Sequence, residues 1–554
     1  MMDADALVVG AGPNGLVAAN VLADAGWSVI VLEAASNPGG GATSGRYVDP
    51  AFISDLCSAF YPLAVVSPAI RALDLEKHGL AWRHAPYVLA HPLLDGRALA
   101  ISRDVSTTTQ ILDTLASGDG AAWQELVTLW ERISDALLDS LATPFPPVRA
   151  GVRLLRALYP LGIGRFARMA TLPVRRLSEE YFRGPTGLLL AGNALHADFA
   201  PESALSGFYG WFLAMLAQSV GFPVAEGGAQ SLTDALVRRL MARGGKIRCG
   251  QSVRHIVVRT GRAVAVRLED GEELGARRAV LAAVPAPTLY GELVDREALP
   301  ATLRRDMTRF HWDFGTVKVD WALDRPVPWR SEIARQAGTV HVSASMDELT
   351  DYSAQLAKGL VPDRPFVIVG QLSTADPSRS PAGTESLWGY THIPQQVRGD
   401  AGPDGLEGRW DSHEIDLFAD RIEAQIERFA PGFRDCIRAR VVHGPRELDA
   451  AHLGLRNGAF GLGTAALHQQ AVFRPTPGTG RPETPVQNLY LASSSAHPGA
   501  GVHGLCGWNA AQAALHADDL TTRLIGTPLR LLAERLARGR DDRPPKPTET
   551  PQPN

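Results

Sequence analysis

The first apolar segments of the chain predict a strand, a helix and a second strand in close succession. Residues 7–9 form a short apolar run of the kind that is buried in a parallel sheet. A helix is predicted over residues 13–25, and Gly26 ends it. A second apolar run at residues 27–32 stops at an acidic residue, Glu33. This order is typical of a dinucleotide-binding unit.

Three glycines between the first strand and the helix have the spacing G-x-G-x-x-G. Gly10 allows a tight turn, Gly12 admits a pyrophosphate close to the backbone, and Gly15 lets the helix pack closely on the strand. The positive end of the helix dipole points at those phosphates, and Glu33 is placed to bind a ribose hydroxyl. The residues predicted to contact the dinucleotide are Gly10, Gly12, Pro13, Asn14, Gly15 and Glu33.

A turn-rich loop, residues 34–45, follows Glu33 and carries the glycines Gly39, Gly40 and Gly41. An acid at the end of the second strand with paired glycines soon after it resembles the extended FAD signature of the amine oxidase and phytoene desaturase superfamily. In many members an arginine follows the paired glycines, whereas Gly41 stands here. The resemblance implies FAD as the cofactor. It also implies an α/β fold, with a Rossmann-like FAD-binding domain of the glutathione-reductase type and an inserted mixed α+β substrate domain.

The region after Glu226 predicts a helix to about residue 242 and a strand over 246–249. Short strands follow at 252–259, 263–268 and 279–283. This order resembles the second FAD-binding segment of the same superfamily. The resemblance implies that the backbone of Val253 meets the adenine.

The last organised stretch, residues 488–515, predicts a strand over 489–492, a glycine loop and a helix that begins near Gly504. The helix N-terminus would stabilise negative charge on a reduced flavin ring. The loop H-P-G-x-G-x-x-G resembles the C-terminal FAD motif of carotenoid desaturases. With Asn457-Gly458 and Phe473-Arg474-Pro475 upstream, the ending resembles the pyridine nucleotide-disulphide oxidoreductase domain-containing protein 2 branch. The predicted flavin contacts are Gly499, Gly501, Val502 and Gly504.

The stretches between these segments predict a substrate region. Residues 204–222 are uncharged, but their polar residues and glycines favour a buried helix that lines a cavity over a membrane span. Strands with one buried face are predicted at 315–323, 366–372 and 386–392, and a helix at 414–429. The resulting division is FAD-binding segments at 1–80, 223–299 and 455–525, substrate segments at 81–222 and 300–454, and a partly disordered tail at 526–554.

Composition excludes several classes of function. The chain has 554 residues, 45% of them hydrophobic, and a net charge of -4, so nothing indicates a nucleic acid partner. The N-terminus leads almost directly into a core strand, which leaves no room for a secretion signal and favours a cytoplasmic location. Cysteines and histidines are scattered, so we expect neither a disulfide nor a metal site. These residues include Cys57, Cys249, Cys436, Cys506, His311, His341 and His392.

Residues 140–178 contain seven arginines and no acidic residue, with large apolar residues between the arginines. This pattern would suit peripheral docking on an anionic membrane. A solvated basic face, or one paired with acids elsewhere in the fold, explains the same pattern slightly better. The arginines are Arg149, Arg153, Arg156, Arg165, Arg168, Arg175 and Arg176.

The leading hypothesis is an FAD-dependent oxidoreductase that transfers hydride between an apolar organic substrate and flavin N5, with oxygen or a quinone as an electron acceptor. His497 and His503 flank the expected ring site and suit acid or base chemistry, while packing or backbone hydrogen bonding explains each equally well. Trp508 and Asn509 are placed to line the site or to join the core. Cys506 offers a thiol for a covalent flavin, which the loop motif does not require.

Three alternatives stay open. A flavin amine or amino-acid oxidase would need a buried arginine or an aromatic cage, and the sequence assigns neither. A low-turnover flavoprotein would act mainly as a partner-binding or membrane-binding module, which the arginine-rich stretch favours. An isomerase would use reduced FAD without net oxidation.

Overall fold

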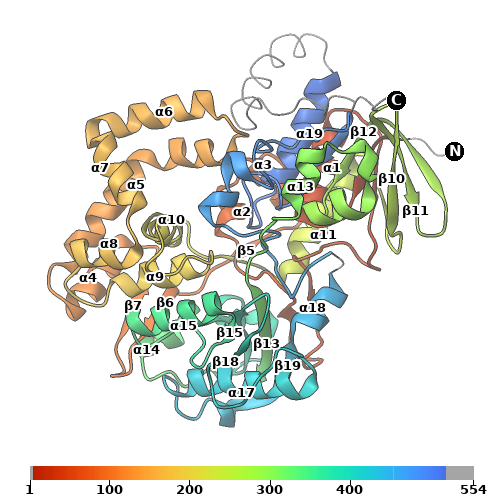
Figure 1. Cartoon of the computed structure of the whole chain (residues 1–554). Coiled ribbons are helices and arrows are strands. Elements are labelled where there is room, and N and C mark those ends of the chain that lie inside the picture. Colours follow the sequence, from red (N-terminus) through yellow and green to blue (C-terminus); the bar gives the residue numbers. More distant parts are fainter. Residues whose placement is uncertain (1–3, 453, 519–554) are drawn as a thin grey trace, which may run out of the picture.

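The computed structural model describes residues 4–452 and 454–518. Two sheets of seven strands each organise the described residues, one in the upper half and one in the lower half of Figure 1. Helices from α4 (Val105–Leu115) to α10 (Ser206–Ser219) form a separate group at the left of that view. The α/β architecture with an inserted mixed substrate domain is confirmed. The predicted tail at 526–554 lies outside the described residues.

The first sheet is built around β1 (Ala4–Val9), which pairs in parallel with β2 (Val29–Leu32) and β12 (Glu273–Ala282). Strand β9 (Lys246–Arg248) adds to β2, and β20 (Leu489–Leu491) adds to β12, both in parallel. Parallel pairing within one sheet therefore joins three segments that are far apart in the sequence.

Helices cover one face of this sheet. α1 (Pro13–Asp24), α11 (Ala229–Ala242) and α19 (Leu505–Asp518) pack there against alternate residues of β1, β2 and β12. The other residues of these strands are buried in a second cluster on the opposite face. Burial on both faces explains why the strand at 7–9 is wholly apolar.

The hairpin β10 (Val253–Arg259) and β11 (Arg262–Leu268) pairs antiparallel with the first half of β12. This pairing explains why the strand predicted at 279–283 is longer than expected and begins at Glu273. Glu273, Arg277 and Arg278 lie in the part of β12 before Ala279, so a continuous apolar pattern marks only the end of the strand that is inside the core.

The second sheet has the order β19-β13-β17-β16-β14-β6-β7. The bounds of these strands, in that order, are Ile437–His443, Gly315–Leu323, Glu385–Ile393, Val367–Gln371, Ala337–Val342, Tyr87–Pro92 and Ala98–Ile101. Most neighbours are antiparallel, but β14 and β6 are parallel. The two predicted substrate segments therefore share one sheet.

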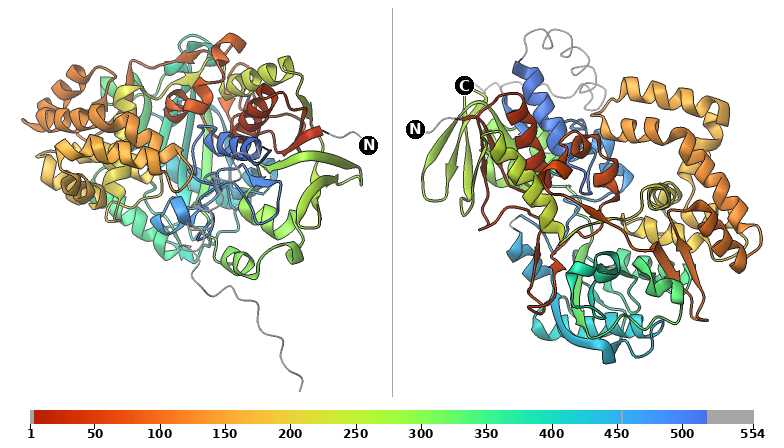
Figure 2. Two further views of the ribbon diagram at one scale, coloured as in Figure 1. Left: turned by 90° about the horizontal axis from the view of Figure 1, so that it is seen from above. Right: turned by 180° about the vertical axis from the view of Figure 1, so that it is seen from behind.

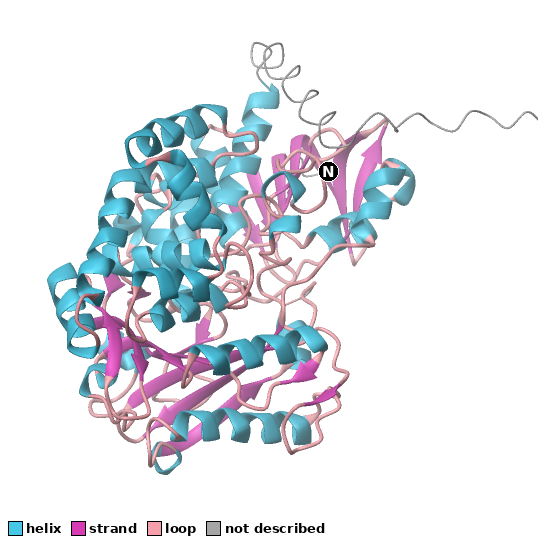
Figure 3. Ribbon diagram, turned by 60° about the vertical axis from the view of Figure 1, so that its left-hand side comes forward, coloured by secondary structure: helices cyan, strands magenta, loops and turns pink. Residues whose placement is uncertain are grey.

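Strand β13 corrects the prediction of one buried face, because all nine of its residues are buried. Val317, Val319 and Trp321 pack toward α17 (Ser412–Glu427), which lies against that side of the sheet. On the other face, Thr316 and Lys318 line an internal cavity. Figure 3 shows helices on both faces of this lower sheet.

The remaining helices of the left-hand group are α5 (Asp119–Ala142), α6 (Val148–Leu158), α7 (Ile163–Thr171), α8 (Val174–Tyr181) and α9 (Gly187–Leu195). Helix α10 packs against α5, α7, α8 and α9, and Figure 2 shows this helical group from above and from behind. The prediction that residues 204–222 contain a buried helix lining a cavity is confirmed, since Phe208 and Phe212 reach a cavity wall. Among the described residues, no helix is both long and apolar enough to cross a bilayer.

A buried arginine connects the two halves of the molecule. The guanidinium of Arg379, which is fully buried, donates to both carboxylate oxygens of Asp55 at 3.0 and 3.1 Å and to Asp376 at 3.2 Å. Arg379 also donates to the carbonyl oxygen of Ala225 at 3.2 Å. Asp55 in turn accepts from the backbone N–H of Ala229, at the start of α11, at 2.8 Å. Charged groups of two segments and backbone groups of a third are thus paired away from water.

We expect Arg379→Leu to lower the free energy of unfolding by about 3–5 kcal/mol, because it leaves two carboxylates buried without their counter-charge. Urea unfolding followed by tryptophan fluorescence measures this loss. Arg254→Leu is the control, since Arg254 is 71% exposed. A loss no larger than that of the control would show that the cluster does not stabilise the fold.

Candidate functional site

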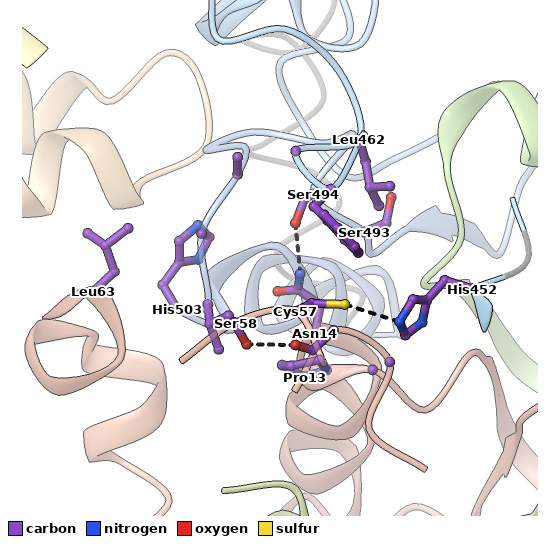
Figure 4. Close-up of a pocket in the computed structure, with 18 of the residues that line it drawn as sticks. Pro13, Asn14, Cys57, Ser58, Leu63, His452, Leu462, Ser493, Ser494 and His503 are labelled. Atoms are coloured by element: carbon purple, nitrogen blue, oxygen red, sulfur yellow. Dashed lines mark hydrogen bonds between the residues drawn. The ribbon is translucent and has the colours of Figure 1, made fainter. Parts of the chain in front are cut away.

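A single cavity of about 1800 Å³ lies where the three segments of the first sheet meet the second sheet. Its wall includes the glycine turn before α1, Val253 of β10, Lys318 of β13 and the loop before α19. Most ligand pockets measure about 300–1000 Å³, so this volume suits a dinucleotide and a substrate together. Figure 4 shows the part of the cavity between α1 and α19.

The glycine turn before α1 has the geometry that the sequence predicts. Gly10 has a φ of +98°, which favours glycine. A Cβ on Gly15 would stand 2.0 Å from the carbonyl oxygen of Gly10, so only glycine lets α1 approach β1 this closely. Gly12 is the N-cap residue and provides no side-chain hydrogen bond. The N–H groups of the first helical turn have no intrahelical acceptor and are available to an anion.

The second glycine loop rests on the first. The backbone N–H of Gly39 donates to the carbonyl oxygen of Ala11 at 3.0 Å. A Cβ on Gly40 would come within 3.1 Å of the Cα of Gly12. The two loops therefore touch through backbone atoms, and Gly40 and Gly41 form part of the cavity wall beside Gly12.

Glu33 lines the cavity and also fixes the first glycine turn. Its carboxylate accepts from the backbone N–H of Ala11 at 2.7 Å and from that of Ala35 at 2.9 Å. The acid at the end of β2 thus holds the turn as well as facing the expected ribose position. The sequence predicted only the second role.

The loop before α19 closes the cavity against α1. The side-chain amide of Asn14 donates to the hydroxyl of Ser494 at 3.3 Å (Figure 4). A Cβ on Gly507 would lie 1.8 Å from the carbonyl oxygen of Asn14, so this glycine sets the spacing of the two helices. Gly504 likewise lies against Val17, where a Cβ would come within 2.7 Å of a side-chain carbon.

The cavity collects most of the predicted cofactor residues and both predicted histidines. The residues on its wall are Gly10, Gly12, Pro13, Asn14, Gly15, Glu33, Gly40, Gly41, Val253, His497, Gly501, Val502 and His503. Three other predicted contacts, Gly39, Gly499 and Gly504, are not on that wall. They act instead through loop conformation and packing, since all three have a positive φ and close neighbours.

These features fit FAD. Gly12 and Gly40 leave the backbone open where a diphosphate would lie, and Val253 and Gly501 line separate parts of the same cavity. No arginine is among the lining residues of the described chain, which agrees with Gly41 in place of the usual arginine. Backbone N–H groups and the dipole of α1 would therefore carry the diphosphate charge.

His503 is held by the backbone at both ring nitrogens. Its Nδ1 accepts from the N–H of Leu505 at 3.0 Å, and its Nε2 donates to the carbonyl oxygen of Gly499 at 3.2 Å. Burial lowers its pKa to about 4. The ring is therefore neutral at pH 7, and both of its nitrogens are engaged by the backbone of the loop. An acid or base role for His503 stays a prediction.

His497 keeps one nitrogen available. Its Nε2 donates to the carbonyl oxygen of Thr143 at 3.0 Å, while its buried Nδ1 has no partner among the described residues. Burial lowers the pKa of His497 to about 4 as well. An acid or base role for this residue stays a prediction.

Three further residues near α19 belong to the core. Cys506, Trp508 and Asn509 are absent from the cavity wall within the described chain. Cys506 is buried, and burial raises the pKa of its thiol to about 11. Asn509 donates to the carbonyl oxygen of Ala142 at 3.1 Å, which joins α19 to the end of α5. None of the three is placed to contact a ligand in the cavity.

The thiol that does reach the cavity is Cys57, which the sequence did not single out. Its Sγ lies 3.1 Å from Nε2 of His452 (Figure 4). Burial raises the pKa of Cys57 and lowers that of His452, so both groups are neutral at pH 7. The pair is therefore not an activated thiolate.

A polar cluster occupies another part of the wall. Asp198 and Asp313 lie there with His392, whose Nε2 is 3.4 Å from Oδ1 of Asp198. Burial raises the pKa of Asp198 to about 7, and burial together with the charge of Asp198 raises that of Asp313 to about 6. Nearby, the hydroxyl of Tyr390 is hydrogen-bonded to Nδ1 of His196 at 2.6 Å. No sequence pattern pointed to these residues, which come from separate elements.

The two-loop dinucleotide cradle, the joined sheet segments and the large cavity that they share define an FAD-dependent oxidoreductase. The chain belongs to the flavin containing amine oxidoreductase family, which matches residues 14–515. The resemblance to the amine oxidase and phytoene desaturase superfamily is therefore confirmed.

Individual relatives agree with this assignment. Pyridine nucleotide-disulfide oxidoreductase domain-containing protein 2 of Rattus norvegicus is 28% identical over 549 residues, which cover 92% of each chain. A phytoene desaturase (neurosporene-forming) of Cereibacter sphaeroides is 24% identical, with 97% of this chain and 98% of the relative covered. The crystal structure of an oxidoreductase from Methanosarcina mazei has a TM-score of 0.58 at 16% identity, with 92% and 99% covered, and shows the same fold.

Two glycine variants separate cofactor binding from folding. A Cβ on Gly12 would meet only the Cα of Gly40, at 4.0 Å, so we expect Gly12→Val to fold but to lose FAD. Gly15→Val should lose both, because its Cβ would overlap the oxygen of Gly10. Flavin absorbance and circular dichroism of the purified proteins measure these outcomes. Stoichiometric FAD in Gly12→Val would contradict the site.

The raised pKa of Asp198 predicts a pH dependence of stability. The folded state keeps a proton that the unfolded state loses between about pH 4 and pH 7, so stability falls as the pH rises through this range. Asp198→Asn has no such proton, and its melting temperature should fall less between about pH 5 and pH 8. Between these two pH values, the free energy of unfolding of the wild type should fall by at least about 1.4 kcal/mol more than that of Asp198→Asn. This amount is the equivalent of one pKa unit.

Asp351→Asn is the control for this experiment, because Asp351 is exposed on α15 (Met346–Lys358). Thermal unfolding of the three FAD-loaded proteins at both pH values gives the comparison. Parallel pH profiles for the wild type and Asp198→Asn would contradict the assignment of the raised pKa.

Proposed function

We propose that the chain is a dehydrogenase for an organic substrate with a large apolar body. The observation that carries this proposal is the composition of the wall that α5, α10 and the second sheet supply. The part of that wall from α5 and α10 is aliphatic and aromatic, with Leu138, Leu141, Leu205, Phe208, Phe212 and Leu213, and the sheet adds Ile368 and Trp388 beside the polar residues Thr316, Lys318, Thr339 and His341. Apolar surface of this kind gains free energy by covering apolar substrate surface.

The chain itself positions the substrate and excludes water. Helix α10 presents Phe208 and Phe212 to the cavity, and their rings stack with centroids 6.1 Å apart. Phe208 and Phe212 also contact Trp211 and Trp130 respectively, so these side chains are held by the helical core. When bound, FAD supplies the redox chemistry by accepting the two electrons that leave the substrate. The phytoene desaturase relative is named for a reaction of the desaturation class, which agrees with this proposal.

A second candidate is the oxidation of an amine, and the acidic cluster favours it. Asp198 and Asp313 have no lysine or arginine in ion-pair contact among the described residues. Lys318, the one lysine on the described cavity wall, is paired with Asp320. Aromatic rings of Tyr390, Trp388 and Tyr209 share the wall with the two acids. A carboxylate beside aromatic faces is a binding environment for an ammonium group.

Anaerobic reduction of the FAD-loaded protein distinguishes the two candidates. We expect terpenoid hydrocarbons or alcohols to bleach the visible flavin band, and primary amines with the same carbon skeletons to do so only if the second candidate holds. Subsequent addition of oxygen or a soluble quinone identifies the electron acceptor.

Two variants assign the result to the cavity. Leu213→Gln places an amide on the apolar wall and should slow bleaching by an apolar substrate by at least about tenfold. Asp198→Asn should leave that rate unchanged but abolish bleaching by an amine. Leu94→Gln, at a side chain that is 47% exposed, is the control. Bleaching of wild type and Leu213→Gln at equal rates would contradict the proposed substrate site.

A further inference from the structure

Helix α6 has an apolar stripe that faces solvent. Val148, Val152 and Leu155 of α6 and Tyr159, the residue that directly follows the helix, are 60, 43, 51 and 78% exposed. Their spacing of four, three and four residues places them within an arc of about 60° on the helix surface. The opposite side of α6, with Ala150 and Leu158, is buried against the helical core. The stripe is therefore additional to the face that holds the helix in the fold.

A row of arginines runs beside this stripe. Arg149, Arg153 and Arg156 each follow a stripe residue by one position, which turns them by about 100° around the helix. Arg153 is paired with Asp139. Arg149 and Arg156 have no acidic partner within the described chain, and the same holds for Arg165 of α7. Residues 143–171 contain five arginines and no acid, although the whole chain has a net charge of -4.

The sequence left open whether acids elsewhere pair with the arginines of residues 140–178. The structure divides them. Arg168 pairs with Glu180, Arg175 with Glu202, and Arg176 with Glu179, all in or next to α7 and α8. Unpaired positive charge is thus concentrated on α6 and the start of α7, beside the exposed apolar stripe.

This surface is continuous with the helix that enters the cavity. Leu138, Leu141 and Ala142 at the end of α5 line the cavity wall, and α6 begins six residues later at Val148. The connection is held in place by the hydrogen bond from Phe145 to Gly480 at 3.1 Å. In Figures 1 and 2, α6 and α7 form an outer corner of the molecule, away from both sheets.

We propose that α6 and the start of α7 dock on an anionic lipid bilayer. The apolar stripe would enter the boundary between headgroups and acyl chains, and the arginine row would lie against lipid phosphates. Both features are needed for this partner, since a purely electrostatic partner gives no reason for the exposed Leu155 and Tyr159. Docking would place α5, and with it the cavity wall, close to a reservoir of apolar compounds.

Vesicle co-sedimentation of the FAD-loaded full chain tests the proposal without requiring turnover. We expect binding to phosphatidylcholine vesicles that contain phosphatidylglycerol, weak binding without it, and weaker binding at high salt. Arg149→Gln/Arg156→Gln/Arg165→Gln should lower the partition coefficient at least about tenfold. Val152→Ser/Leu155→Ser/Tyr159→Ser should lower it by a similar factor.

Matched variants elsewhere control for general charge and hydrophobicity. Arg254→Gln/Arg259→Gln/Arg267→Gln removes three exposed arginines from the hairpin β10–β11, and Leu94→Ser/Met241→Ser removes two exposed apolar residues. These should bind as the wild type does. Flavin content and melting temperature establish that every variant is folded.

Three results would overturn the proposal. They are equal binding with and without phosphatidylglycerol, unchanged binding by both α6 variants, and a dimer in light scattering that the Val152→Ser/Leu155→Ser/Tyr159→Ser variant abolishes. The last would assign the stripe to a second copy of the chain. None of these results bears on the proposed substrate oxidation, which is measured by flavin bleaching in the absence of vesicles.

Discussion

The close contact between helices α1 and α19 is the constraint on which the cofactor half of the molecule depends. It joins the first and last described segments at Asn14 and Gly507, where no side chain larger than hydrogen fits. The parallel addition of β12 to β1, and of β20 to β12, imposes the same geometry on the sheet below these helices. Once this contact forms, the diphosphate turn and the loop before α19 must face one cavity. The chemistry of the site is thus a consequence of helix and strand spacing.

The second sheet and the helical group meet this cofactor half through very different surfaces. On the side of the cavity nearest β12 and β20, the wall consists of backbone, glycine and a few hydroxyl groups. Toward the substrate it offers aromatic rings, aliphatic side chains and one compact acidic cluster. A common cofactor can therefore serve different substrates in this family by changes that leave the glycine turns intact. The buried ion pairs of Arg379 keep the two surfaces in register across the cavity.

Local signals in the sequence were enough to predict the cofactor half. One continuous stretch of the chain contains the strand at 7–9, the glycine turn, the helix at 13–25 and the acid Glu33. The conformation of each of these elements depends on residues close to it in the sequence. The same holds for the helix at 204–222, whose lack of charge predicted burial. Gly39, Gly499 and Gly504 were predicted as ligand contacts, but a glycine pattern cannot distinguish space for a ligand from space for Thr43, Arg474 or Val17.

Other parts of the site had no such signal, because they arise from pairing across long separations. Asp198 and His392 approach only when α9 and β17 are both in place. Cys57 and His452 come from opposite ends of the chain. The tautomer of His503 depends on the carbonyl of Gly499 and the N–H of Leu505, which sequence spacing alone does not orient. On β13, polar residues such as Lys318 suggested a solvent-facing side, whereas the cavity takes the place of solvent.

The parallel pairing of β6 with β14 has a consequence for synthesis on the ribosome. Ala90 of β6 is paired with Val340 of β14. The hairpin β6–β7 is therefore synthesised long before the strand with which it pairs. The delay is on the order of 250 residues, which is about 12 to 50 s at the usual rates of translation. During that time an apolar strand edge is exposed on the nascent chain. Chaperones bind exposed edges of this kind. We therefore expect the yield of folded protein to depend on chaperones even if the folded protein itself is stable.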